Sequence, residues 1–212
     1  MNSEILEKLK MIPNCIYETI FTTYNSDFTP NAAPMGIITP DMRNIVANIY
    51  SSSQTYRNIL ERKCAVINIT NDVFLFYQSL IEKRSLEKEA NLFKKSKKIA
   101  APILISASAY IEATVESIKK IDGNRFKIFF SVKDAEIIDP CATPICRAPN
   151  LILESLIHLT RIETFNRSGE TKKAEQLIEQ VKSYRELINR IAAETKYQLL
   201  MEKIWEKIQR TK

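Results

Sequence analysis

Hydroxyl side chains cluster where a predicted β-strand gives way to a predicted helix. The segment reads Tyr50-Ser-Ser-Ser-Gln-Thr-Tyr-Arg-Asn58, and the helical pattern runs over residues 55–62. A helix N-terminus has N–H groups without partners and a partial positive charge. Hydroxyls and Arg57 beside it would form a cradle for a phosphate group. On this segment alone the simpler interpretation is favoured, in which Ser53 only caps the helix and its neighbours are turn residues.

Two further segments favour a ligand site. Gly36 lies inside a predicted strand, where glycine marks either close approach of a ligand or a bulge or barrel corner. Asn68 lies in another predicted strand, and a buried amide there needs partners, on a neighbouring strand or on a ligand. Backbone groups for a flat heterocycle, followed by hydroxyls for a phosphate, are what flavin mononucleotide (FMN) requires.

Composition excludes several common kinds of site. Only three glycines are present, so no Gly-x-Gly-x-x-Gly fingerprint, Walker A loop or Gly-x-Ser-x-Gly elbow can exist. The single histidine, His158, has no evident nucleophile partner, so a Ser-His-Asp triad is not expected. No Cys-x-x-Cys pair occurs, so a metal site is not expected either. The four cysteines are Cys15, Cys64, Cys141 and Cys146.

The net charge of +6 is concentrated in one segment. Residues 82–98 contain seven Lys or Arg and three Glu. Such a segment either contacts a polyanion or forms a solvated surface. Its only aromatic side chain is Phe93, which leaves little for base stacking. We favour the solvated surface and do not expect a nucleic-acid partner, although RNA binding through Lys94 to Lys98 stays an alternative.

The elements predicted around these residues are mostly strands. Residues 1–10 are typical of a short amphipathic helix, and no secretory signal or membrane-spanning run is found, so a cytoplasmic location is expected. Besides the helix at 55–62, a short helix is predicted at 72–80. Six strands with an early helix favour a closed antiparallel barrel. The predicted strands are 15–24, 32–39, 44–50, 64–70, 103–119 and 125–138.

A proline-rich connection at 139–149 predicts a boundary between two domains, 1–149 and 150–212. Apolar residues recur at helical spacing over 151–165. The same spacing continues over 170–209 with a slip near 193–195, which predicts two further helices. The fold class is therefore mainly β with α, an antiparallel barrel followed by a C-terminal helical region.

As a set, five segments of the sequence resemble a known family. It is the flavin-binding, largely archaeal family of uncharacterised proteins in the FMN-binding split-barrel superfamily, whose relatives include flavin reductases and pyridoxamine phosphate oxidase. The segments that carry the resemblance are Tyr17-Glu-Thr-Ile-Phe-Thr-Thr23, Pro30-Asn-Ala-Ala-Pro-Met-Gly-Ile37, Ser53-Gln-Thr-Tyr-Arg-Asn58, Ala65-Val-Ile-Asn-Ile-Thr70 and Glu154-Ser-Leu-Ile-His-Leu-Thr-Arg161.

The resemblance implies a homodimer with non-covalent FMN near the subunit interface. It implies that the 35–37 strand faces the flavin ring through backbone groups and that Asn68 bonds ring or ribityl oxygens. It places the phosphate among residues 53–58. The implied site residues are Met35, Gly36, Ile37, Ser53, Thr55, Tyr56, Arg57, Asn58 and Asn68. Cys146 departs from the family pattern of Asn before Arg, and Pro149 follows, so ligand contacts from that loop are not carried over.

Helical spacing puts His158 and Arg161 on one helix face. They either help to close the flavin site or, as we favour, bond the helix to its neighbours. For the whole chain the leading hypothesis is a flavin-dependent oxidoreductase of unknown substrate. The alternatives are a non-catalytic flavin carrier or sensor and a basic RNA-binding protein.

Overall fold

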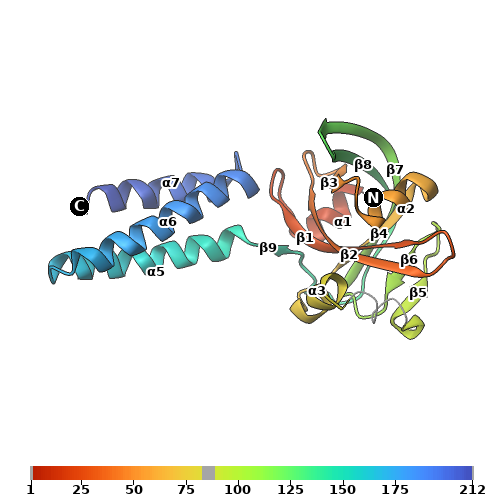
Figure 1. The fold of residues 1–212 in the computed structure, drawn as a ribbon, viewed down its shortest axis with the longest axis horizontal. Helices are drawn as coiled ribbons and strands as arrows, with labels where there is room; N and C mark the ends of the chain where they lie inside the picture. The colour runs from red at the N-terminus through yellow and green to blue at the C-terminus, as the bar shows by residue number, and fades with distance from the viewer. Residues whose placement is uncertain (1, 83–88, 212) are drawn as a thin grey trace. The chain divides into compact units, whose positions relative to one another are not determined.

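The first part of the chain is a closed antiparallel barrel. The computed structural model describes residues 2–82 and 89–211 (Figure 1). Six strands pair in the ring order β1-β2-β3-β8-β7-β4, and β4 pairs back with β1 to close it. The strands are β1 (Tyr17–Tyr24), β2 (Pro30–Ile38), β3 (Ile45–Tyr50), β4 (Cys64–Ile69), β7 (Ala109–Asp122) and β8 (Arg125–Ile137). The predicted antiparallel barrel is confirmed.

One predicted strand is wrong. Residues 103–119 do not form one strand, because β6 (Pro102–Leu104) ends in a turn before β7 begins at Ala109. The N–H of Ala107 donates to the carbonyl of Leu104 in this turn. β6 pairs with β5 (Phe93–Lys95), which the sequence did not predict, in a separate two-stranded sheet. A 3-10 turn, η1 (Ala90–Leu92), precedes β5, and a short strand, β9 (Ile145–Cys146), follows the barrel.

The barrel core explains why β4 is buried along its whole length. One side of the sheet closes on the barrel interior, where Phe21 and Phe130 meet edge to face with ring centroids 5.6 Å apart. The other side is covered by the segment around β6, where Val66 packs with Ala101 and Ile103. Apolar area removed from water on both faces is the main source of stability of such a strand.

Three helices belong to the barrel part, α1 (Asn2–Lys8), α2 (Gln54–Arg62) and α3 (Val73–Leu80). All three were predicted within two residues of their bounds. The side chains of Ser53 and Asp72 cap the N-termini of α2 and α3 by accepting the N–H of Tyr56 and Phe74. α3 packs on β2.

The chain divides into two compact units, one of residues 1–13 and 17–145 and the other of residues 14–16 and 146–212. The second contains α5 (Ala148–Arg167), α6 (Thr171–Ile191) and α7 (Lys196–Gln209), which pack on one another (Figure 1). The predicted break into two helices is confirmed, because Thr195 caps α7 by accepting the N–H of Tyr197. Among the described residues, no helix has the length and apolar character needed to span a membrane.

His158 and Arg161 of α5 do not share an environment. The His158 ring is buried in the helical unit with its centroid 5.9 Å from that of Tyr184 in α6, whereas Arg161 is exposed. Neither ring nitrogen of His158 has a hydrogen-bond partner among the described residues. We favoured bonds from these two residues to neighbouring helices. His158 does pack against a neighbouring helix, but the expected hydrogen bond from it is wrong.

The basic segment at 82–98 is described only in part, since residues 83–88 lie outside the described residues. The buried carboxylate of Glu112 accepts the N–H groups of Lys97 and Lys98 at 2.9 and 2.7 Å. The Lys97 ammonium lies 3.1 Å from Glu136. A hydrogen bond from the Tyr110 hydroxyl, together with Lys97, holds the pKa of Glu136 below its ordinary value. The described end of the segment is thus attached to β7 and β8.

Candidate functional site

A pocket of about 390 Å³ forms where β2, the end of β3, the start of α2 and the end of α3 meet. Its volume is within the range of small-molecule sites, about 300–1,000 Å³. It brings together four of the predicted site residues, Met35 and Gly36 of β2 with Ser53 and Thr55 of α2. The full lining is Ala33, Pro34, Met35, Gly36, Asn48, Ile49, Tyr50, Ser53, Gln54, Thr55, Ser79 and Leu80.

Ser53 occupies the N-cap position of α2. Its backbone is extended, with φ −75° and ψ 148°, and its Oγ accepts the N–H of Tyr56 at 3.1 Å. The same hydroxyl donates to the carbonyl of Tyr50 at 2.8 Å. Ser53 is therefore the N-cap of α2, and a cap does not decide whether a ligand also binds there. The N–H groups of Gln54 and Thr55, in the first turn, have no acceptor within the helix, and they stand at the pocket with the positive end of the helix dipole.

Behind this turn lies a buried network of amide and hydroxyl groups. The Asn58 amide donates to Thr23 Oγ1 and to Asn25 Oδ1, both at 2.9 Å, and Asn58 Oδ1 accepts from Gln54 at 2.7 Å. Asn31 of β2 donates to Thr23 Oγ1 at 3.0 Å and to Thr55 Oγ1 at 3.2 Å. The side chains of Thr55 and Asn58 are thus held under the helix.

The other predicted residues of α2 lie outside the pocket lining. Arg57 is exposed and donates through Nε and Nη2 to Gln54 Oε1, at 3.2 and 2.8 Å. Tyr56 is buried, with its ring 4.8 Å from that of Phe126 in β8. This contact fixes α2 against the barrel, while Arg57 leaves a cation one helical turn from the cap.

Ile37 and Asn68 are placed in the barrel wall. Ile37 is fully buried in β2. Asn68 is fully buried in β4, and its amide nitrogen donates to the carbonyl of Ile20 and to Thr22 Oγ1, both at 2.9 Å. Its Oδ1 accepts the N–H of Leu104 at 2.9 Å. Both amide hydrogens are therefore used within the barrel, and the structure does not bring Asn68 to the pocket.

Eight lining residues were not among the predicted site residues, namely Ala33, Pro34, Asn48, Ile49, Tyr50, Gln54, Ser79 and Leu80. Ala33, Pro34 and Gln54 lie within two residues of predicted ones. Tyr50 stood inside the segment that was singled out, and Asn48 lies two residues earlier on the same strand face. These two could have been found from the alternation of β3. Ser79 and Leu80 carry no local signal, because they reach the pocket only through the packing of α3 on β2.

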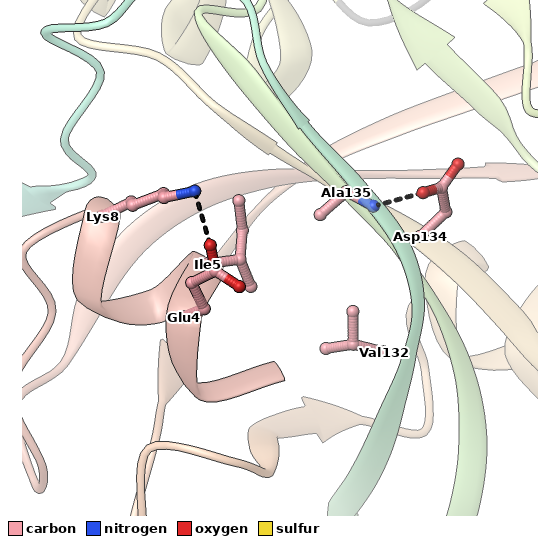
Figure 2. Close-up of a pocket in the computed structure, with 6 residues that line it drawn as sticks. All are labelled: Glu4, Ile5, Lys8, Val132, Asp134 and Ala135. Atoms are coloured by element: carbon pink, nitrogen blue, oxygen red, sulfur yellow. Dashed lines mark hydrogen bonds and ion pairs between the residues drawn. The ribbon is translucent and has the colours of Figure 1, made fainter. Parts of the chain in front are cut away.

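A smaller pocket, of about 170 Å³, lies between α1 and β8 (Figure 2). Its charged groups already have partners in the structure. Lys8 bonds Glu4 at 2.8 Å, and Asp134 accepts the N–H of Ala135 at 3.0 Å. The ammonium of Lys8 lowers the pKa of Glu4. The pocket at α2 is therefore the better candidate.

The closed antiparallel barrel matches the split-barrel fold. The chain belongs to the family described as "Protein of unknown function (DUF447) N-terminal domain", whose model matches residues 17–139. The expected family is thereby confirmed.

Solved structures share the fold. An FMN-bound protein of the DUF447 family from Methanosarcina mazei aligns with a TM-score of 0.56 at 23% identity, over 95% of this chain and 99% of that chain. An NADH:FAD oxidoreductase from Streptomyces globisporus aligns with a TM-score of 0.52 at 10% identity, over 66% and 86%. A putative flavin reductase with a split-barrel domain from Shewanella frigidimarina gives a TM-score of 0.51 at 12% identity, over 57% and 67%.

Proposed function

We propose that this protein binds FMN in the pocket between β2 and the N-terminus of α2. The observation that carries the proposal is the meeting of Met35 and Gly36 with Ser53 and Thr55 in one pocket. The first two residues belong to a barrel strand and the other two to the start of a helix. Together they offer a flat backbone surface at one end and anion-binding N–H groups at the other.

The residues present fit the two ends of FMN. The phosphate would lie at the first turn of α2, where the N–H groups of Gln54 and Thr55 and the cation of Arg57 favour negative charge. The ring would lie along Pro34 to Gly36. The lining of the described pocket carries no formally charged side chain, which suits an uncharged ring. Bound flavin would supply hydride or electron transfer, and the protein would supply binding and orientation.

We further propose that the protein is a flavin-dependent oxidoreductase. Support comes from the related folds of an FMN-bound family member and of an NADH:FAD oxidoreductase. A non-catalytic flavin carrier or sensor is the alternative. Anaerobic mixing with NADH or NADPH distinguishes the two. An oxidoreductase that uses either donor reduces the bound flavin and bleaches its visible absorption band at a rate at least as fast as turnover. A carrier leaves the band unchanged.

The first prediction tests the cofactor itself. Purified protein reconstituted with flavin should bind FMN at least about tenfold more tightly than riboflavin, because a charge-assisted phosphate contact contributes about 1.5–3 kcal/mol. Calorimetric titration of the flavin-free protein with each compound measures the difference. Equal affinities would remove the phosphate site from α2, and no binding of either would remove the proposed function.

A homodimer with the pocket near its interface is proposed from the surface of α3. Phe74 is 74% exposed and Leu80 is 65% exposed, and Val73, Tyr77 and Ile81 add to the same exposed apolar helix. Large exposed apolar patches mark interaction surfaces. Leu80 also lines the pocket, so a second copy of this chain covering α3 would border the bound flavin.

The second prediction tests this interface. Phe74→Glu should convert a dimer to a monomer in light scattering at micromolar concentration with FMN present, because a charge would be buried without a partner. Ile121→Glu at the tip of the β7–β8 hairpin, where Ile121 is also exposed, serves as the matched control and should stay dimeric. A monomeric wild-type protein, or a dimer that tolerates Phe74→Glu, contradicts the proposed interface.

A further inference from the structure

Two cysteines from distant parts of the chain meet in the helical unit. The Sγ atoms of Cys15 and Cys146 are 3.5 Å apart, although the residues are separated by 131 positions. A disulfide requires an S–S distance of about 2.05 Å, so a shift of less than about 2 Å would join them. We propose that Cys15 and Cys146 are a redox-active pair that forms a reversible disulfide. This inference does not depend on flavin binding.

The fold itself holds the two thiols together. Both belong to the same compact unit, Cys15 in residues 14–16 and Cys146 directly before α5. The N–H of Ile16 donates to the carbonyl of Ile191 at the end of α6, at 2.8 Å, which fixes the segment that carries Cys15. The pair thus lies where this short segment meets the helices.

Tyr197 of α7 shares this environment. Burial raises the pKa of its hydroxyl, and negative charge on Cys146 or Cys15 raises it further. Tyr197 is thus within electrostatic range of both sulfur atoms. The pair therefore lies before α5 and near the end of α6, with Tyr197 of α7 within electrostatic range, all in one unit.

The difference in exposure of the two thiols assigns their roles. Cys146 is partly exposed and Cys15 is buried, so Cys146 meets an external disulfide first. Its thiolate attacks one sulfur of a low-molecular-weight disulfide and releases one thiolate. The Cys15 thiolate then attacks Cys146 Sγ and releases the second. Two protein thiols are oxidised, the external disulfide is reduced to two thiols, and the two protein protons pass to the departing thiolates.

The other two cysteines are not placed for this reaction. Cys64 is buried in β4, where its thiol contacts the carbonyl of Ala100 at 3.5 Å and burial raises its pKa. A thiol of raised pKa is a poor thiolate source. Cys141 is exposed, so its thiolate can exchange with the external disulfide to a mixed disulfide and release one thiol. It shows no neighbouring sulfur among the contacts of the described residues, so formation of a bridge within the chain should be selective for one pair.

Closing this disulfide has a consequence for stability. Cys15 precedes the barrel strands in the sequence and Cys146 follows them, so the bond would close a long loop of chain. Cross-links that close long loops restrict the unfolded chain most. The oxidised protein should unfold at a higher temperature than the reduced protein, by about 5–10 °C for a chain of this size. A dithiol reductant should reverse the shift.

The test uses the full chain and oxidised glutathione. Treated protein should lose the thiols of Cys15 and Cys146 without keeping glutathione on either, and digestion without reductant should give one peptide pair joined through Cys15 and Cys146. The exposed Cys141 can carry one glutathione, which peptide mass distinguishes from the bridge. Cys15→Ser should instead retain one glutathione on Cys146 and show no rise in melting temperature. Cys141→Ser, the matched control, should form the same bridge between Cys15 and Cys146 and show the same rise in melting temperature.

Each other outcome overturns the proposal. Free thiols at both Cys15 and Cys146 after treatment would show that the pair does not react. A bridge to Cys64 or Cys141, or a bridge only between two chains, would show that the fold does not select this pair. If the melting temperature stays unchanged after the Cys15–Cys146 disulfide has formed, the disulfide does not stabilise the fold by restricting the unfolded chain.

Discussion

Ser53→Asp is expected to weaken FMN binding by about 100-fold and to leave riboflavin binding within about twofold. Aspartate caps helices as well as serine does, so the bond to the N–H of Tyr56 would be kept and α2 would still begin at Gln54. The new carboxylate would stand where the phosphate is proposed. Two like charges about 4 Å apart repel by about 4 kcal/mol at an effective dielectric constant of about 20. Solvent at this partly exposed position lowers the repulsion to about 2.7 kcal/mol, which corresponds to a loss of FMN affinity of about 100-fold.

Ser53→Asn is the matched control for this substitution. Asparagine also caps helices well but carries no charge, so FMN affinity should change by only a few-fold. Calorimetry with FMN and riboflavin on both variants gives the comparison, and melting of the flavin-free proteins checks that the helix is intact. If Ser53→Asp weakens both flavins equally, the effect is on the fold, and the phosphate does not lie at α2.

The start of α2 could be predicted because a helix cap is a local signal. Ser53 bonds an N–H only three residues ahead, so residue type and spacing were sufficient. The same holds for Asp72 at α3 and for the break before α7. Met35 and Gly36, which were singled out because a glycine inside a strand pattern is conspicuous in sequence, line the pocket.

Features set by contacts between distant segments could not be predicted. The turn that ends β6 contains no glycine or proline, and it is held by Ile105 donating to Leu92 and Ser108 donating to Ile69. Ser79 and Leu80 join the pocket only after α3 packs on β2. Neither arrangement leaves a pattern in the residues themselves.

The roles of Thr55 and Asn58 illustrate an intermediate case. Both lie in the segment proposed to hold the phosphate, yet their side chains bond Asn31, Thr23 and Asn25. Helical spacing puts residues 55, 58 and 62 on one face, and Arg62 also bonds the carbonyls of residues 24–26. The spacing was visible in the sequence, but its meaning required knowing that this face meets the end of β1.

Asn68→Leu is expected to lower the free energy of unfolding by about 3–5 kcal/mol. Leucine has a similar volume but cannot bond, so the N–H of Leu104 and the carbonyl of Ile20 lose the partner that Asn68 provides. Each buried group left without a partner costs about 1–3 kcal/mol, and Ile20, Asn68 and Leu104 are all buried. Urea denaturation of the flavin-free protein measures the loss, which would be a large fraction of a typical stability of about 5–15 kcal/mol.

Asn48→Ala is the matched control, because Asn48 is a barrel asparagine, in β3, that is exposed and lines the pocket. Its substitution should change the free energy of unfolding by less than about 0.5 kcal/mol. FMN affinity should show the reverse pattern. Asn48→Ala should lose affinity for FMN, whereas the folded fraction of Asn68→Leu should bind FMN nearly as the wild type does. If Asn68→Leu instead keeps full stability and loses FMN, its amide serves the flavin, and the barrel bonds seen for it are replaced when FMN binds.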